Sequence, residues 1–241
     1  MEYSDIHYGT FLSRPNRFTA HVLTEGRNVV CHVKNTGRCR ELLVPGARVL
    51  LEAARNAERK TGYDLVSVYK GERLVNMDSQ APNRIFREWA EKQPYTLVKP
   101  EFSFGDSRLD FYLETQTKKI LAEIKGVTLE INDVALFPDA PTERGVKHLR
   151  ELRKAAACGF SAEVYFIVQM RGIKYFTPSF RHHSEFFLEL EAAAKEGVGV
   201  YAMECDVEPG RVEASGFVPV RFDRDISFGC EAGPSRQGGW I

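Results

Sequence analysis

The first eighty residues carry short runs of apolar and β-branched residues, and each run is followed by a turn signal. Examples of these signals are Glu25-Gly26, Pro45-Gly46 and Lys70-Gly71. The runs occupy residues 19–24, 28–33, 48–53, 64–69 and 73–75. Short strands separated by turns are typical of a small barrel or sandwich. The pattern predicts an OB-like β-barrel of about five strands at residues 1–80, a fold that often binds oligonucleotides.

The pattern changes at residue 81. Helical spacing of Ile85, Phe86 and Trp89 predicts a helix at residues 83–92. Further helices are predicted at residues 141–158 and 185–196, and strands at residues 101–104, 108–114, 119–125, 163–169, 199–205 and 212–218. This order predicts a mixed sheet flanked by helices over residues 81–225, and the whole chain is expected to be of the α/β (α+β) class. Residues 226–241 are expected to form a tail.

Charge and cysteine usage narrow the possible partners. The chain has 33 basic and 33 acidic residues, so only a local patch could hold nucleic acid. Its five cysteines are scattered, which favours reduced thiols over a zinc site. No run approaches the roughly 18 apolar residues of a membrane-spanning helix, and the first ten residues lack the features of an export signal. We therefore expect a cytoplasmic protein with no membrane partner. No feature indicates its oligomeric state.

Three charged residues on a predicted hairpin form the candidate catalytic group. Asp110 lies on the first strand of the hairpin, and Glu123 and Lys125 lie on the second. Because side chains alternate along a strand, Glu123 and Lys125 share one face. In a regular hairpin the same alternation is expected to put Asp110 and Tyr112 on the face opposite Leu109, Phe111 and Leu113.

Hydrolysis of a phosphodiester needs a divalent cation and an activated water, and Mg²⁺ or Mn²⁺ prefers oxygen ligands. Asp110 and Glu123 are the predicted metal ligands, and Glu88 on the preceding helix is the predicted third ligand. Lys125 is predicted to orient or deprotonate the attacking water, or to stabilise the charge that develops on phosphorus. The competing interpretation is that these residues are ordinary exposed strand charges that pair across the hairpin.

Basic residues near this group are candidates for phosphate binding. Arg144, Lys147 and His148 lie three and four residues apart on the predicted second helix and share a face. In the first domain the candidate nucleic-acid-binding residues are Arg14, Arg17, Lys34, Asn35 and Arg38, with Phe18 beside them as a possible stacking surface. The competing interpretations are a solvated helix face and solvated loops.

Five segments carry a resemblance to a known family. They are Arg14-Pro15-Asn16-Arg17-Phe18, Lys34-Asn35-Thr36-Gly37-Arg38, Ser107-Arg108-Leu109-Asp110-Phe111, Glu123-Ile124-Lys125-Gly126-Val127-Thr128-Leu129, and the run from Phe137 to Leu149. Their order resembles that of the sugar fermentation stimulation protein A (SfsA) family. The resemblance runs from about Gly9 to Val220.

The resemblance implies an amino-terminal OB-like domain and a PD-(D/E)xK-type nuclease domain in a DNA-binding protein linked to the control of sugar metabolism. Asp110, Glu123 and Lys125 match the nuclease pattern, and Leu109 replaces the proline of its name. The expected function is metal-dependent cleavage of DNA or RNA. The alternative is a non-catalytic DNA-binding regulator of sugar metabolism genes that keeps a nuclease-like fold. Action on a small phosphorylated metabolite is a third possibility.

Overall fold

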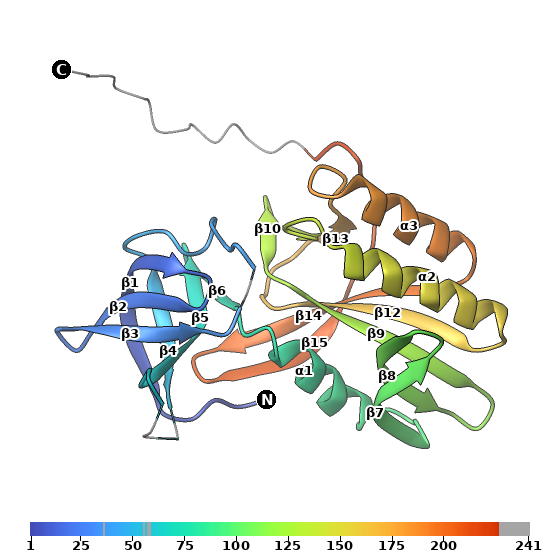
Figure 1. Cartoon of the computed structure of the whole chain (residues 1–241), viewed down its shortest axis with the longest axis horizontal. Coiled ribbons are helices and arrows are strands. Elements are labelled where there is room, and N and C mark those ends of the chain that lie inside the picture. The colour runs from blue at the N-terminus through green and yellow to red at the C-terminus, as the bar shows by residue number, and fades with distance from the viewer. Residues whose placement is uncertain (36, 55, 57–58, 227–241) are drawn as a thin grey trace.

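A computed structural model describes residues 1–35, 37–54, 56 and 59–226. Two domains lie side by side, with the barrel at the left of Figure 1 and a helix-flanked sheet at the right. Of the helices described, none combines the length and apolar character that crossing a membrane requires. Apart from residue 226, the predicted tail at residues 226–241 lies outside the described residues.

The first domain is a five-stranded barrel with one additional strand. Strands β1 (Ile6–Asn16), β2 (Thr19–Thr24), β3 (Arg27–Val33), β4 (Arg48–Ala53) and β5 (Tyr63–Lys70) pair in the order β3-β2-β1-β4-β5. Parallel pairing of β3 with β5 closes the barrel, and β6 (Arg73–Asn76) extends β5. The OB-like prediction is therefore confirmed. The sequence pattern did not predict β1.

The second domain is built on a six-stranded mixed sheet of order β15-β14-β12-β9-β8-β7. Its strands are β7 (Leu97–Phe104), β8 (Ser107–Glu114), β9 (Lys119–Val127), β12 (Ser161–Val168), β14 (Gly199–Glu208) and β15 (Arg211–Val218). The predicted mixed sheet with flanking helices is confirmed. A smaller sheet of β10 (Leu129–Ile131), β11 (Val134–Phe137) and β13 (Tyr175–Pro178) was not predicted.

Three helices cover the two faces of the large sheet (Figure 1). Helix α1 (Ala81–Ala90) packs Phe86 against Phe111 on one face, with 4.9 Å between the ring centroids. Helices α2 (Glu143–Ala157) and α3 (Ser184–Lys195) lie on the other face, where Leu149 belongs to the same buried cluster as Leu109. The catalytic candidates of β9 therefore belong to the face covered by α2, because Ile124 between them packs toward α1.

One detail of the predicted hairpin is wrong. Leu109 packs on the α2 side, whereas Phe111 packs on the α1 side, although simple alternation puts both on one face. The irregularity is shared with β7, where Pro100 pairs with Phe111 and Phe102 pairs with Leu109, and Glu101 between them has a φ of 56°. The register of β7 with β8 is the same on both sides of this point, so the irregularity moves side chains to the other face without inserting a residue.

Candidate functional site

A cavity of about 390 Å³ lies where the start of α1, strands β8 and β9, and the first turn of α2 converge. Its lining comprises Ser79, Gln80, Asn83, Asp110, Glu123, Ile124, Lys125 and Arg144. The fold thus brings all three predicted catalytic residues to one cavity.

Glu123 is the buried centre of the group, with 1% of its surface exposed. Its Oε1 accepts a hydrogen bond of 2.5 Å from Lys125 Nζ and also contacts Nδ1 of His148. Burial opposes ionisation, but the hydrogen bond from His148 and the charge of Lys125 outweigh it, so the pKa of Glu123 is lowered. Its second oxygen, Oε2, is buried and has no hydrogen-bond partner among the described residues.

Asp110 is half-buried and is held by two donors. Asn83 Nδ2 donates to Oδ1 at 3.0 Å, and the backbone N–H of Ile124 donates to Oδ2 at 2.8 Å. The regular backbone pairing of β8 with β9 ends at Phe111 and Ala122. Just beyond this point, the Asp110 side chain accepts the hydrogen bond of a β9 backbone N–H. Burial, followed by the negative charge of Glu123, raises the pKa of Asp110.

Close packing of α1 on β9 puts Asn83 at the site. A Cβ atom at Gly126 would lie 2.7 Å from Pro82 Cγ and 2.7 Å from Gln169 Oε1. Glycine directly after Lys125 therefore lets the first turn of α1 lie on the strand. The sequence did not identify Asn83, because its contact with Asp110 depends on this packing.

Glu88 does not reach the cavity. Its carboxylate oxygen Oε2 lies 2.5 Å from the amino group of Met1, on another side of α1. The structure therefore contradicts the predicted position of Glu88 as a third ligand beside Asp110 and Glu123. Residues 83 and 88 are five positions apart, which separates their side chains by roughly 140° around a helix.

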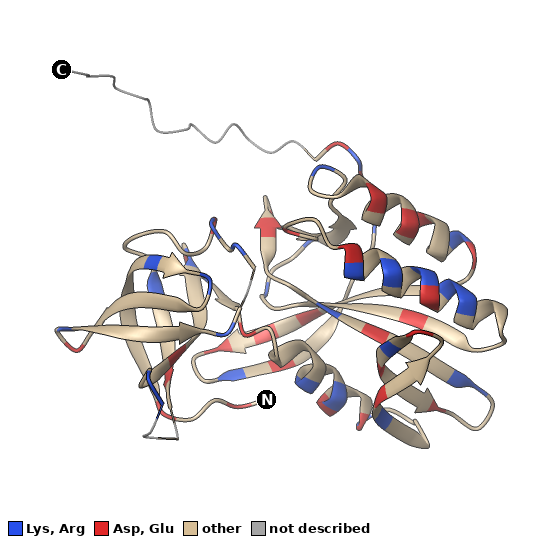
Figure 2. Ribbon diagram, in the orientation of Figure 1, with Lys and Arg blue, Asp and Glu red and all other residues tan. Residues whose placement is uncertain are grey.

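The basic residues of α2 divide into two groups along the helix. Arg144 and Lys147 are exposed, and in the described part of the chain neither forms an ion pair with a carboxylate. The later residues Arg150, Arg153 and Lys154 are each paired with a glutamate. His148 is buried beside Glu123, so its predicted role as a surface phosphate ligand is not supported. Figure 2 shows this mixture of charges along α2.

The barrel candidates also divide into internal and exposed residues. The Arg14 guanidinium donates to four backbone carbonyls, and Lys34 Nζ lies 3.4 Å from carboxylate oxygens of three acidic residues. Asn35 Oδ1 accepts a 2.7 Å hydrogen bond from Gly37 N. These contacts contradict the prediction that the Arg14 and Lys34 side chains are free for nucleic acid, whereas the role of Asn35 stays a prediction. Arg17 and Arg38 are exposed, and neither side chain forms an ion pair within the described ranges.

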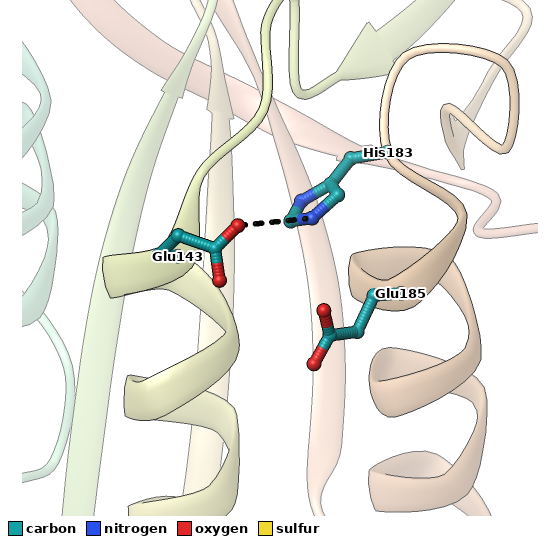
Figure 3. Close-up of side chains that lie close together, drawn as sticks. All are labelled: Glu143, His183 and Glu185. Atoms are coloured by element: carbon teal, nitrogen blue, oxygen red, sulfur yellow. Dashed lines mark ion pairs between the residues drawn. The ribbon is translucent and has the colours of Figure 1, made fainter.

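A separate group of possible ligands lies at the starts of α2 and α3. Oxygen and nitrogen atoms of Glu143, His183 and Glu185 lie within 4.8 Å of one another (Figure 3). His183 Nε2 is 3.7 Å from Glu143, and its Nδ1 accepts from the backbone N–H of Thr142 at 3.3 Å. Both glutamates are exposed, and Glu185 also pairs with Arg150. These contacts explain the cluster as a set of interactions that link the starts of α2 and α3.

Comparison with known proteins identifies both domains. Residues 12–77 match the SfsA N-terminal OB domain, and residues 80–211 match the sugar fermentation stimulation protein RE domain. A sugar fermentation stimulation protein homolog from Desulfitobacterium hafniense is 56% identical over 92% of this chain and 98% of its own length. A homolog from Ruminiclostridium cellulolyticum is 50% identical over 92% of this chain and 100% of its own length.

A solved structure agrees with this assignment. The structure of Pyrococcus furiosus SfsA in complex with Ca²⁺ has a TM-score of 0.84 and 28% sequence identity, and the match covers 92% of this chain and 98% of that one. The family matches cover the barrel and most of the helix-flanked sheet. The chain therefore belongs to the sugar fermentation stimulation protein (SfsA) family.

Proposed function

We propose that this protein is a metal-dependent nuclease that hydrolyses phosphodiester bonds of DNA or RNA. The observation that carries the proposal is the pairing of two carboxylates that differ in their surroundings. Glu123 presents a buried oxygen without a hydrogen-bond partner among the described residues, and Asp110 lines the same cavity. A buried polar atom without a partner costs free energy, so its presence beside an open cavity favours a ligand-binding role.

The residues fit a divalent cation such as Mg²⁺ or Mn²⁺. Glu123 Oε2 and the carboxylate of Asp110 would hold it, since hard cations prefer oxygen ligands and Mg²⁺ usually keeps several waters. When bound, such a cation neutralises charge on the scissile phosphate and lowers the pKa of a coordinated water. The P. furiosus relative was solved with Ca²⁺, another cation that takes oxygen ligands.

The remaining side chains would orient the reactants. Lys125 lines the cavity and can donate a hydrogen bond to the attacking water or to the developing negative charge. His148 holds Glu123 from the side of α2, and Asn83 holds Asp110 from the side of α1. Arg144 lines the cavity and can bind a phosphate oxygen.

Exposed cations of α2 and of the barrel would form a path for the nucleic-acid backbone. Arg144 and Lys147 belong to α2, and Arg17 and Arg38 belong to the barrel. The OB domain supports the same partner, because OB barrels often bind oligonucleotides. This path would be local, since the chain carries no excess of positive charge.

The second candidate is a DNA-binding regulator without catalytic activity. It is favoured by the name of the relatives, which refers to stimulation of sugar fermentation. Carboxylates facing an anionic ligand disfavour it, because without a cation they repel phosphate.

A cleavage assay separates the two functions. Linear DNA, circular DNA and RNA are incubated with the protein and Mg²⁺, Mn²⁺ or a chelator, alongside the Asp110→Asn variant. Cleavage that needs the cation and Asp110 supports the nuclease. Binding without cleavage under every metal condition supports the regulator.

A further inference from the structure

We infer that Arg14 is a positioning residue of the nuclease centre, although it lies in the barrel. Its guanidinium donates to four backbone carbonyls. The acceptors are Arg17 O at 2.8 Å, Asn35 O at 2.7 Å, Gly37 O at 2.9 Å and Arg38 O at 2.9 Å. We call these contacts the Arg14 clamp. They hold the end of β1 to the loop that follows β3, at residues 34–38, of which residue 36 lies outside the described ones.

One end of this loop contacts the segment that enters α1. The carbonyl oxygen of Lys34 accepts hydrogen bonds from Ser79 N at 3.1 Å and Ser79 Oγ at 2.5 Å. Lys34 Nζ lies 3.4 Å from Asp78, whose other oxygen accepts from Gln80 N at 2.9 Å. Ser79 and Gln80 line the cavity. The loop therefore supports the cavity wall directly before Asn83.

The other part of the loop packs against the segment that enters α2. A Cβ atom at Gly37 would lie 3.0 Å from Asp139 Oδ2 and 2.8 Å from Asn35 Oδ1. Asp139 precedes Thr142, whose side chain caps α2 by accepting from Gly145 N at 3.1 Å. Glycine thus allows the barrel to approach this helix entry closely. Arg144 in the first turn of α2 lines the cavity.

The loop therefore contacts both chain segments that lead into the helices beside the site. Asn83 of α1 holds Asp110, and His148 of α2 contacts Glu123. Movement of either helix start would change the distance between the two carboxylates. The Arg14 clamp sets the shape of the loop and hence the separation of the two helix starts. This role of Arg14 rests on the proposed nuclease function.

The clamp also connects the barrel's exposed cations with the site. Two of its four acceptors are the carbonyl groups of Arg17 and Arg38, whose side chains are the exposed barrel candidates for phosphate binding. Nucleic acid bound by these side chains would act on the same backbone that contacts the helix starts.

The test compares Arg14→Met and Arg14→Lys with the wild type and with Arg27→Ala. Arg27 is exposed in the barrel at the start of β3 and serves as the matched control. Lysine keeps the positive charge of Arg14, but it lacks the planar guanidinium group that donates hydrogen bonds to four carbonyl oxygens. Cleavage at saturating nucleic acid, nucleic-acid affinity and amide hydrogen exchange are measured on the full chain, at a temperature where each variant is fully folded.

Both Arg14 variants are expected to lower the maximal cleavage rate by at least about tenfold, because small displacements of reacting groups can cost up to roughly 100-fold. Affinity for nucleic acid should change less than about threefold, and Arg27→Ala should leave the rate unchanged. A wild-type rate in Arg14→Lys would overturn the clamp, since charge alone would then suffice. Equal losses of rate and affinity would also overturn it.

Hydrogen exchange keeps the inference testable if the wild type does not cleave nucleic acid. Peptides covering residues 79–84 and 139–145 should exchange at least about threefold faster in both Arg14 variants, whereas the turn between β14 and β15 should not change. Faster exchange without wild-type cleavage would reject the nuclease function and keep the structural coupling. Unchanged exchange in both peptides would overturn the inference whatever the activity.

Discussion

Two of the lysine–carboxylate clusters among the described residues, around Lys34 and around Lys125, differ in whether every buried carboxylate oxygen has a partner. Around Lys34, the carboxylates of Glu52, Asp64 and Asp78 each lie 3.4 Å from Nζ. Around Lys125, Glu123 accepts the lysine on Oε1 and leaves Oε2 without a partner among the described residues. The first cluster joins parts of the barrel to the domain linker, and the second faces the cavity between α1 and α2.

One aspartate from each cluster, Asp64 and Asp110, has its pKa shifted in the opposite direction to the other. Burial opposes ionisation of Asp64, but Arg59 and Lys34 outweigh it and lower its pKa. Burial and the charge of Glu123 raise the pKa of Asp110. The closed cluster has a partner within the protein for its carboxylates, whereas the open cluster leaves a buried carboxylate oxygen, Glu123 Oε2, that a divalent ion could bind. This contrast separates a structural role from a functional one.

The largest expected effect is the loss of cleavage in Lys125→Ala. Removing a group that orients water or stabilises developing charge should lower the rate by on the order of 100-fold to 10,000-fold. Nucleic-acid affinity should remain nearly unchanged, as measured by fluorescence anisotropy. Lys119→Ala, at the exposed start of the same strand, is the control and should retain the wild-type rate. Parallel loss of binding and cleavage in Lys125→Ala would contradict its catalytic role.

Lys34→Met should instead act on stability. It leaves the largely buried carboxylates of Asp64 and Asp78 without this cation, so the free energy of unfolding should fall by about 3 kcal/mol. Urea unfolding followed by circular dichroism measures the change. Lys92→Met, at an exposed position after α1, should change the free energy by less than about 0.5 kcal/mol. Equal changes in the free energy of unfolding for the two variants would show that the closed cluster does not stabilise the protein.

The two aspartates should give opposite pH dependences. The lowered pKa of Asp64 contributes stability above its unfolded pKa of about 3.9, and this stability is lost as pH falls through the folded pKa. The raised pKa of Asp110 favours the protonated form, so its contribution is present at low pH and is lost as pH rises through the folded value.

Urea unfolding of Asp64→Asn and Asp110→Asn between about pH 3 and about pH 7 tests these signs. Relative to the wild type, Asp64→Asn should become less stable as pH rises. Asp110→Asn should become more stable over the same range. Slopes of the same sign would refute the distinction between the clusters.

The smallest expected effect concerns the barrel surface. Arg17→Ala should weaken nucleic-acid binding only a few-fold, and the slope of log affinity against log salt should fall by about 0.7 to 0.9 for one lost phosphate contact. Salt titrations of binding, with Arg27→Ala as the control, measure this slope. An unchanged slope would remove Arg17 from the interface.

The sequence predicted the elements whose signals are local. Turn dipeptides and alternation located β2 through β6, and the period of two put Glu123 and Lys125 on one face. Strand β1 escaped prediction because its pairing with β2 shifts register near Phe11 and Ser13, and its burial does not alternate regularly. The small sheet was missed because β10, β11 and β13 have at most four residues each.

The wrong or incomplete site predictions depended on tertiary contacts. Arg14 and Lys34 carry charges that suit nucleic acid, but the folded barrel uses both internally. His148 shares a helical face with Arg144, yet packing of α2 on the sheet buries it beside Glu123. Residue type and spacing identified these positions as important without distinguishing a surface ligand from an internal partner.

Anomalous diffraction from a crystal grown or soaked with Mn²⁺ tests the central claim most directly. The open cluster should bind the ion, with anomalous density between the carboxylates of Asp110 and Glu123 in the wild type and none there in Asp110→Asn. The closed cluster around Lys34 should show no density in either protein. Density only at the Glu143, His183 and Glu185 group, or no density at Asp110 and Glu123 at a saturating concentration, would contradict the proposed metal centre.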